Sequence, residues 1–221
     1  MKTYLKLIAF ISVFLLISCE NEDDKTQIQQ EDYFNLKVGN TWVYKNYTRK
    51  SNQELENNNI LDSVIITDKF SFENKEFYVR ETFKKYLTIN QTSLYQTDYL
   101  YINQHNHLIS LAVHPEEENT LKEYVLHPGT DKELIFENEI IIGSNSYGKQ
   151  IYQLENEKNI EIEGKSFLSS PFVGRLQPND KITKELVTEY HYSKNIGLVK
   201  EIVPTVSGTT IFERHLISYK N

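Results

Sequence analysis

Histidine has the widest chemical range of any residue type in this 221-residue chain, because a neutral imidazole binds zinc and titrates near neutral pH. Four of the six histidines, His105, His107, His114 and His127, fall within a short span. Catalytic zinc needs three protein ligands and an open fourth position. Residues 103–107, however, separate two apolar runs, and His114 and His127 each precede a proline, which indicates turns. We therefore expect solvated turn histidines, no metal site and no cofactor.

Carboxylates and hydroxyls form no recognisable catalytic pattern. The glutamates at 116–118 are contiguous, so their side chains diverge and cannot flank a substrate as an acid and a base. The segment 143–148 has neither the Gly-x-Ser-x-Gly elbow nor a phosphate-binding loop. Single carboxylates on predicted strands, such as Glu81 and Glu189, can face either a pocket or solvent. No catalytic residue is predicted, and an envelope hydrolase with strand-borne carboxylates stays as the alternative function.

Aromatic side chains are the remaining candidates, since Phe, Trp and Tyr make up 12% of the chain. Many of them lie two apart, and residues two apart on a strand share one face of a sheet. Tyrosine suits faces that are partly wet, where its ring could stack on a sugar or hold a lipid. Tyrosine and phenylalanine are also simply favourable strand residues. The predicted ligand-binding residues are Trp42, Tyr44, Tyr99, Tyr101, Tyr190 and Tyr192.

The single cysteine, Cys19, follows a basic start and an apolar run at 7–17. This run is too short to cross a bilayer, which takes about 20 apolar residues, and it ends in an acidic segment. The residues Leu16-Ile17-Ser18-Cys19 resemble the lipobox of bacterial lipoprotein precursors. The resemblance implies a diacylglyceryl group, with acyl chains such as palmitate, on the Cys19 sulfur, cleavage before Cys19, and acylation of the new amino group. Two or more acyl chains anchor a protein stably.

Charge and composition organise the chain around this anchor. We predict a signal peptide at 1–18, a flexible acidic tether at 19–32 and a single antiparallel β domain at 33–221. The net charge of −7 becomes more negative once the signal peptide is removed, which argues against nucleic acid as a partner. The acidic run after Cys19 resembles the surface-export signal of Bacteroidota lipoproteins. We expect attachment to the membrane through the lipid anchor, at the periplasmic or surface face of the outer membrane.

The domain itself shows a β pattern, with short runs rich in Val, Ile, Thr, Tyr and Phe between polar clusters. We predict a mainly β fold: a single antiparallel, strongly curved sheet, forming a half-open or closed barrel, with at most one or two short helices. A helical turn is expected at 30–36, an exposed loop at 49–59, tight reversals at 195–197 and 207–208, and Pro204 at an edge or bulge. The predicted strands are 41–48, 61–70, 76–87, 93–102, 108–113, 121–126, 133–142, 148–154, 167–176, 185–192, 198–203 and 210–219.

Two further stretches carry a resemblance. Residues 36–44, read as Leu-Lys-Val-Gly-Asn-Thr-Trp-Val-Tyr, and residues 192–200, which contain Gly-Leu-Val, resemble the opening strand and closing hairpin of uncharacterised Bacteroidota lipoproteins. These are similar in outline to the LolA/LolB-like half-barrel group, whose curved sheet can cradle acyl chains. Together with the aromatic residues, the resemblance implies a non-enzymatic binding or assembly module that holds a lipid or glycan on a concave aromatic face. The sequence identifies no partner protein.

Overall fold

Antiparallel strands make up nearly all the regular structure of the computed structural model, which describes residues 34, 36–50, 53–117 and 122–221. These residues belong to one unit, Asp32–Asn221. The predicted signal peptide and the whole of the predicted tether, including Cys19, lie outside the described residues. The strands are β1 (Thr41–Lys50), β2 (Glu56–Phe72), β3 (Lys75–Tyr86), β4 (Gln91–Ile102), β5 (Leu108–Leu111), β6 (Glu123–His127), β7 (Phe136–Ile142), β8 (Asn145–Leu154), β9 (Lys158–Ile162), β10 (Lys165–Leu176), β11 (Leu186–Ser193), β12 (Gly197–Pro204) and β13 (Thr210–Lys220).

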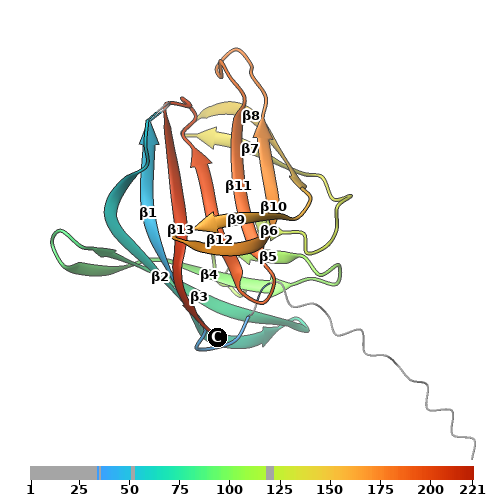
Figure 1. Cartoon of the computed structure of the whole chain (residues 1–221). Coiled ribbons are helices and arrows are strands. Elements are labelled where there is room, and N and C mark those ends of the chain that lie inside the picture. Colours follow the sequence, from blue (N-terminus) through green and yellow to red (C-terminus); the bar gives the residue numbers. More distant parts are fainter. Residues whose placement is uncertain (1–33, 35, 51–52, 118–121) are drawn as a thin grey trace, which may run out of the picture. The chain divides into compact units, whose positions relative to one another are not determined.

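The strands form one sheet in the order β6-β5-β4-β3-β2-β1-β13-β12-β11-β10-β8-β7, with β9 paired to β10 alone. The sheet curls round so far that its two edge strands, β6 and β7, leave a single seam (Figure 1). The side chain of Val125 packs against clusters on both sides of this seam. The predicted fold class, a single strongly curved antiparallel sheet forming a half-open barrel, is confirmed.

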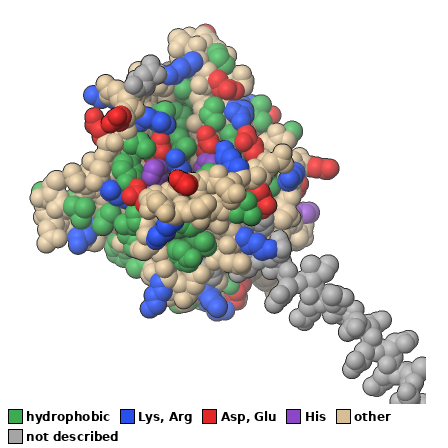
Figure 2. Space-filling view, viewed as in Figure 1, with side chains coloured by type: hydrophobic (Ala, Val, Ile, Leu, Met, Phe, Trp, Pro, Cys, Tyr) green, Lys and Arg blue, Asp and Glu red, His purple; other side chains and the backbone are tan. Residues whose placement is uncertain are grey.

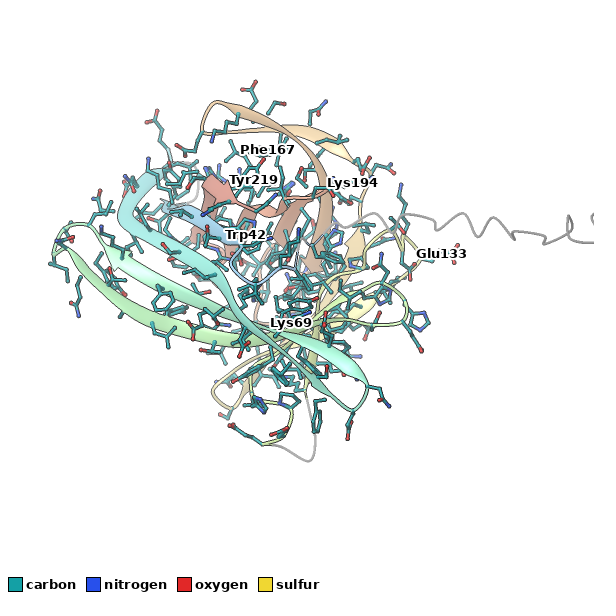
Figure 3. The ribbon with its side chains drawn as sticks, turned by 90° about the horizontal axis from the view of Figure 1, so that it is seen from below. Trp42, Lys69, Glu133, Phe167, Lys194 and Tyr219 are labelled. Atoms are coloured by element: carbon teal, nitrogen blue, oxygen red, sulfur yellow. The ribbon has the colours of Figure 1, made fainter. Side chains whose placement is uncertain are left out.

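Bulges and alternation set the curvature and the two faces of the sheet. The register shifts between Val43 and Tyr44 and between Thr82 and Phe83, and such bulges bend and twist a strand. Inward side chains alternate with outward ones, as the period of two requires. Viewed from below, the ribbon encloses an interior, and Trp42 lies inside it (Figure 3).

An apolar cluster fills one end of this interior. Trp42 and Val64 are cross-strand partners on β1 and β2, and both are buried together with Leu100 and Leu216. Phe34, at the start of the domain, packs edge-on against the ring of Tyr192, with 6.2 Å between ring centroids. The cluster closes the sheet at the end where the chain enters it.

A hairpin that the sequence pattern does not predict lies across the outer face. Strand β9 pairs only with the first half of β10, and this β9–β10 hairpin contacts β13 (Figure 1). Ile162 and Phe167 are buried beneath it, and the ammonium of Lys165 donates to the carbonyl of Ile217 (3.0 Å). Only Ile160 and Ile162 are apolar within β9, too few to stand out as a strand in the sequence.

Several local predictions differ from the structure. The predicted loop at 49–59 is shorter, because β1 and β2 continue their pairing as far as Thr48 and Glu56. Pro204 lies at neither an edge nor a bulge: it ends β12, an interior strand, opposite Ile211. The hairpin at 207–208 is present, but its loop spans residues 205–209.

Other local predictions are confirmed or only partly described. The tight reversal at 195–197 is confirmed, with Asn195 and Gly197 both at positive φ. Of the predicted helical turn at 30–36, Phe34 and Leu36 are described and neither is helical. Within the described ranges there is no helix long and apolar enough to span a membrane.

Candidate ligand-binding cavity

The curved sheet encloses a cavity of about 710 Å³, which is within the range of small-molecule sites. Along β13 the inward side chains become more exposed, from Leu216 at 1% to Phe212 at 49%. The cavity therefore has an apolar floor near Trp42 and an open mouth near Phe212 and Tyr95. Four of the predicted ligand-binding residues line it: Trp42, Tyr44, Tyr190 and Tyr192.

Charged side chains occupy the level between the floor and the mouth. On β1, Tyr44 follows Trp42 on the same face, and its partner on β2 is Asp62. Across β3 and β4, Arg80 stands opposite Asp98. We call this level the polar belt, and its members are Asp62, Arg80, Asp98, Glu201 and Arg214.

Arginine and carboxylate pairs hold the belt together. Arg80 donates to Asp98 Oδ2 through Nη2 (2.8 Å) and Nε (3.1 Å), and Gln96 donates to Asp98 Oδ1 (2.6 Å). Arg214 Nε lies 2.5 Å from a Glu201 oxygen. Asp98 is buried, so the guanidinium of Arg80 offsets the cost of burying its charge.

Arg214 lies at the centre of the belt. Its Nη1 is 3.5 Å from Asp62 Oδ2, and its guanidinium lies over the Tyr44 ring, 5.2 Å from the ring centroid. Burial alone would lower the pKa of Arg214, but the charges of Glu201 and Asp62 outweigh this effect and raise it. Asp62 is only 2% exposed, and no described residue donates a hydrogen bond to its Oδ1. Asp62 thus gives the cavity lining a buried acceptor to which the described part of the chain donates no hydrogen bond.

The aromatic walls are fixed by hydrogen bonds and remain uncharged. Trp42 Nε1 donates to the carbonyl of Ile196 (2.6 Å), and the Tyr44 hydroxyl donates to that of Leu198 (2.8 Å). Burial raises the pKa of Tyr44 well above its usual value, and it raises the pKa of Tyr192 to about 12. At neutral pH these phenols are donors, not anions.

Tyr190 forms part of a second aromatic wall with Tyr152. Their rings are nearly parallel, at 22°, with centroids 6.3 Å apart. Tyr152 lies directly against Gly174, its cross-strand partner, where an added Cβ would approach the ring to 2.4 Å. Glycine at 174 is therefore required for the position of this wall.

The other two predicted ligand-binding residues, Tyr99 and Tyr101, lie outside the cavity. They belong to a separate cluster with Phe70, Phe77 and His114, in which Phe70 and His114 stack with ring centroids 4.8 Å apart. The Tyr101 hydroxyl donates to a Glu123 oxygen (2.5 Å). A ligand in the cavity would not meet these two tyrosines, and their role in binding stays a prediction.

The prediction of solvated turn histidines is confirmed for His105, which lies exposed between β4 and β5, whereas His114, between β5 and β6, is half-buried against Phe70. His107 is 7% exposed, and His127, which is the last residue of strand β6 and not part of a turn, is fully buried. His127 Nδ1 accepts from the amide of Gly129 (3.1 Å), so its Nε2 donates to the carbonyl of Ser170 (3.2 Å). Burial lowers the pKa of His127 to about 4, which keeps the ring neutral. The described part of the chain brings no three His, Cys, Asp or Glu side chains together as a metal site.

Strand-borne carboxylates of the kind that the hydrolase alternative requires lie on both faces. Glu189 does not line the cavity. Its oxygen is 2.9 Å from His191 Nε2, and His191 Nδ1 is 3.0 Å from Ser169 Oγ. This array resembles a nucleophilic triad in composition, but Ser169 is fully buried, so its hydroxyl is out of reach of a substrate. The array connects β10 to β11 instead.

Another buried carboxylate, Glu213, organises the ion pairs near the β9–β10 hairpin. Arg49 (2.8 Å), Lys200 (3.0 Å) and His215 (2.9 Å) surround it, and His215 also approaches Glu163 on the hairpin (3.5 Å). Burial alone would raise the pKa of Glu213, but the hydrogen bonds from His215 and Lys200 and the charge of Arg49 hold it at about 2. Acidic, basic and histidine side chains gather near this hairpin (Figure 2).

The polar belt is the part of the site that sequence reasoning missed. Asp62 and Arg214 lie in strand runs where isolated charges normally face solvent. The available signal was the alternation itself, because Asp62 precedes Val64 and Ile66 on the same face of β2, and both of these are buried. A charge in phase with buried apolar residues indicates an inward position.

Comparisons with known proteins identify the fold but no family. No family model matches the chain, and no curated protein matches it. An exported protein of Bacteroides fragilis, provisionally described and with a YmcC-like fold, is similar with a TM-score of 0.52 and 11% identity, over 86% of this chain and 100% of that one. A protein of Parabacteroides distasonis, provisionally described as a lipoprotein, gives 0.49 and 15%, over 86% and 99%. The predicted similarity to LolA/LolB-like proteins stays a prediction.

Proposed function

We propose that this chain is a lipid-anchored protein of the bacterial cell envelope that binds a small organic ligand, a lipid or a glycan, in its cavity without turning it over. The cavity carries the proposal. It is a concave site with aromatic walls and a few convergent polar groups, the usual form of a small-molecule site. The lipobox at 16–19 and the two Bacteroidales structures described as lipoprotein and exported protein support the envelope location.

Two observations favour binding over simple structural packing. The space of about 710 Å³ is far larger than the small voids that a well-packed interior contains. Rigid hydrogen-bonded aromatics such as Trp42 and Tyr44 line it, so the walls are preorganised and little entropy is lost when a ligand is ordered there.

The experiment is native mass spectrometry of the chain purified from its own envelope, followed by denaturation and identification of the released small molecule. We expect a bound species that the Tyr190→Ala variant retains poorly, because that side chain forms a cavity wall. Tyr219→Ala is the matched control, since Tyr219 is exposed and does not line the cavity. Equal retention by both variants, or a wild-type chain without any ligand after purification and after incubation with envelope extract, would contradict the proposal.

A further inference from the structure

We propose that the ligand is a neutral, hydroxyl-rich molecule of the saccharide class and that its hydroxyls dock on the polar belt. This inference rests on the proposed function, because it assumes that the cavity binds a ligand. It goes further because it selects glycan over lipid as the ligand class and names the residues that would determine this specificity.

The unused acceptor on Asp62 is the first argument. Asp62 Oδ2 faces Arg214, whereas Oδ1 is buried with no hydrogen-bond donor among the described residues. A buried carboxylate oxygen without a donor is costly, and an incoming hydroxyl would satisfy it with a charge-assisted hydrogen bond. A hydrocarbon chain offers no donor.

The charge balance of the cavity is the second argument. Three cationic side chains, Arg80, Lys84 and Arg214, line it together with three anionic ones, Asp62, Asp98 and Glu201. A fourth lining carboxylate, Glu213, is already held by Arg49 and Lys200. A balanced site has no preference for a charged ligand, so it favours a neutral one.

The chemistry of the belt itself is the third argument. Guanidinium groups only donate hydrogen bonds, and carboxylates only accept them, whereas a hydroxyl does both. A polyol can therefore bridge Arg214 and Asp62, or Arg80 and Asp98, as water would. An acyl chain at this level would strip the ion pairs of solvent without replacing any hydrogen bond, which is strongly unfavourable.

The wall formed by Tyr190 and Tyr152 completes the site. Tyr190 lines the cavity, stacks on the ring of Tyr152 and is the cross-strand partner of the belt residue Glu201, so apolar ring surface lies beside the belt. A sugar ring has an apolar C–H face and a hydroxyl edge, so it can contact the rings and the charges at the same time. The cavity offers the complementary pair of surfaces.

The experiment compares the two ligand classes on the same protein. The full chain in detergent is screened on an array of bacterial and plant oligosaccharides, and the saccharides that bind are measured by titration calorimetry. Dansyl-undecanoic acid serves as the lipid probe in a fluorescence titration. The variants are Asp62→Asn, which keeps shape but loses charge, and Thr82→Val, which removes a buried hydroxyl at the cavity wall without touching an ion pair. Glu81→Gln is the control, because Glu81 neighbours Thr82 but does not line the cavity.

We expect saccharide binding that Asp62→Asn weakens about tenfold or more, as the loss of a hydrogen bond to a charged group should do. Thr82→Val should weaken it too, and Glu81→Gln should not. Unfolding midpoints of the variants separate lost binding from lost folding. Saccharide binding that neither cavity variant changes would overturn the assignment to the belt. Binding of the dansyl probe alone would overturn the inference and leave the proposed function standing, whereas binding of neither class would overturn both.

Discussion

Acid should destabilise this protein in a pH range set by His127, well before its carboxylates titrate. The ring is fully buried, its Nδ1 accepts a hydrogen bond from Gly129, and Phe34, Phe172 and Tyr192 surround it. Burial lowers its pKa from 6.5 to about 4. Between pH 6.5 and pH 4, His127 is therefore protonated in the unfolded chain but neutral in the folded chain.

The sign and size follow from linkage. A histidine whose folded pKa is depressed contributes stability above its unfolded pKa, and that contribution is lost as the pH falls from 6.5 towards 4. The complete shift corresponds to about 3 kcal/mol, at 1.36 kcal/mol per pKa unit. Between pH 7.5 and pH 5 the loss should be about 2 kcal/mol. A domain of ordinary stability, about 5–15 kcal/mol, would show this clearly.

The assay is urea unfolding at pH 7.5, 6 and 5 of the wild type and of His127→Gln, which cannot titrate. The variant should be less stable at pH 7.5 but should lose about 2 kcal/mol less than the wild type between pH 7.5 and 5. His105→Gln is the control and should keep the full pH dependence, since His105 is exposed. If wild type and His127→Gln lose stability in parallel, the reasoning about this buried ring is wrong.

Three further predictions test other parts of the structure. The pKa of Glu213 is depressed to about 2, so this carboxylate should contribute about 3 kcal/mol to the free energy of unfolding, present above pH 4.5 and lost as the pH falls towards 2. Glu213→Gln should remove this pH dependence in urea unfolding. If the variant loses stability below pH 4.5 as the wild type does, the prediction is wrong. Gly174→Ala should displace the Tyr152 ring and lower the free energy of unfolding by about 1–3 kcal/mol. In the double variant with Tyr152→Ala, part of that loss should be recovered, because the clash is gone. If the two losses are strictly additive, the close contact is wrong. Cys19→Ala should move the chain from the membrane fraction to the soluble fraction and abolish labelling by a palmitate analogue, and continued membrane association would remove the anchor from the proposal.

The sheet was predictable because its signals are local and repeated. Alternating runs such as Phe77, Val79 and Phe83 on β3 can be read without knowing the rest of the chain. Strand β9 was not predictable in the same way, because its five residues gain their apolar partners only when the hairpin crosses the outer face near β13. Tertiary contact, not propensity, determines it.

The residues of the site also divide into those that local sequence patterns predict and those that depend on tertiary contacts. Tyr44 and Tyr192 could be selected because aromatic residues two apart on a strand share a face, as Trp42 and Tyr44 do and as Tyr190 and Tyr192 do, and the cavity lining contains all four. His127 was assigned to solvent because proline follows it, yet Phe34, more than 90 residues away, covers its ring. Asp62 and Arg214 pair only because β1 lies between β2 and β13. Such pairs depend on the order of strands in the sheet, which a single sequence does not encode locally.

The seam between the edge strands β6 and β7 makes the circumference of the cavity adjustable. Since each of the described strands β6 and β7 has one ladder partner only, β5 and β8 respectively, hydrogen bonding does not fix the circumference at that point. In a closed barrel the number of strands and their stagger determine the diameter. Here the two edges can separate or approach by small changes in twist without the loss of a single ladder bond. Changes in residues 128–135, which join the two edge strands, would therefore let a chain with this fold bind ligands of different width while the rest of the cavity wall stays constant.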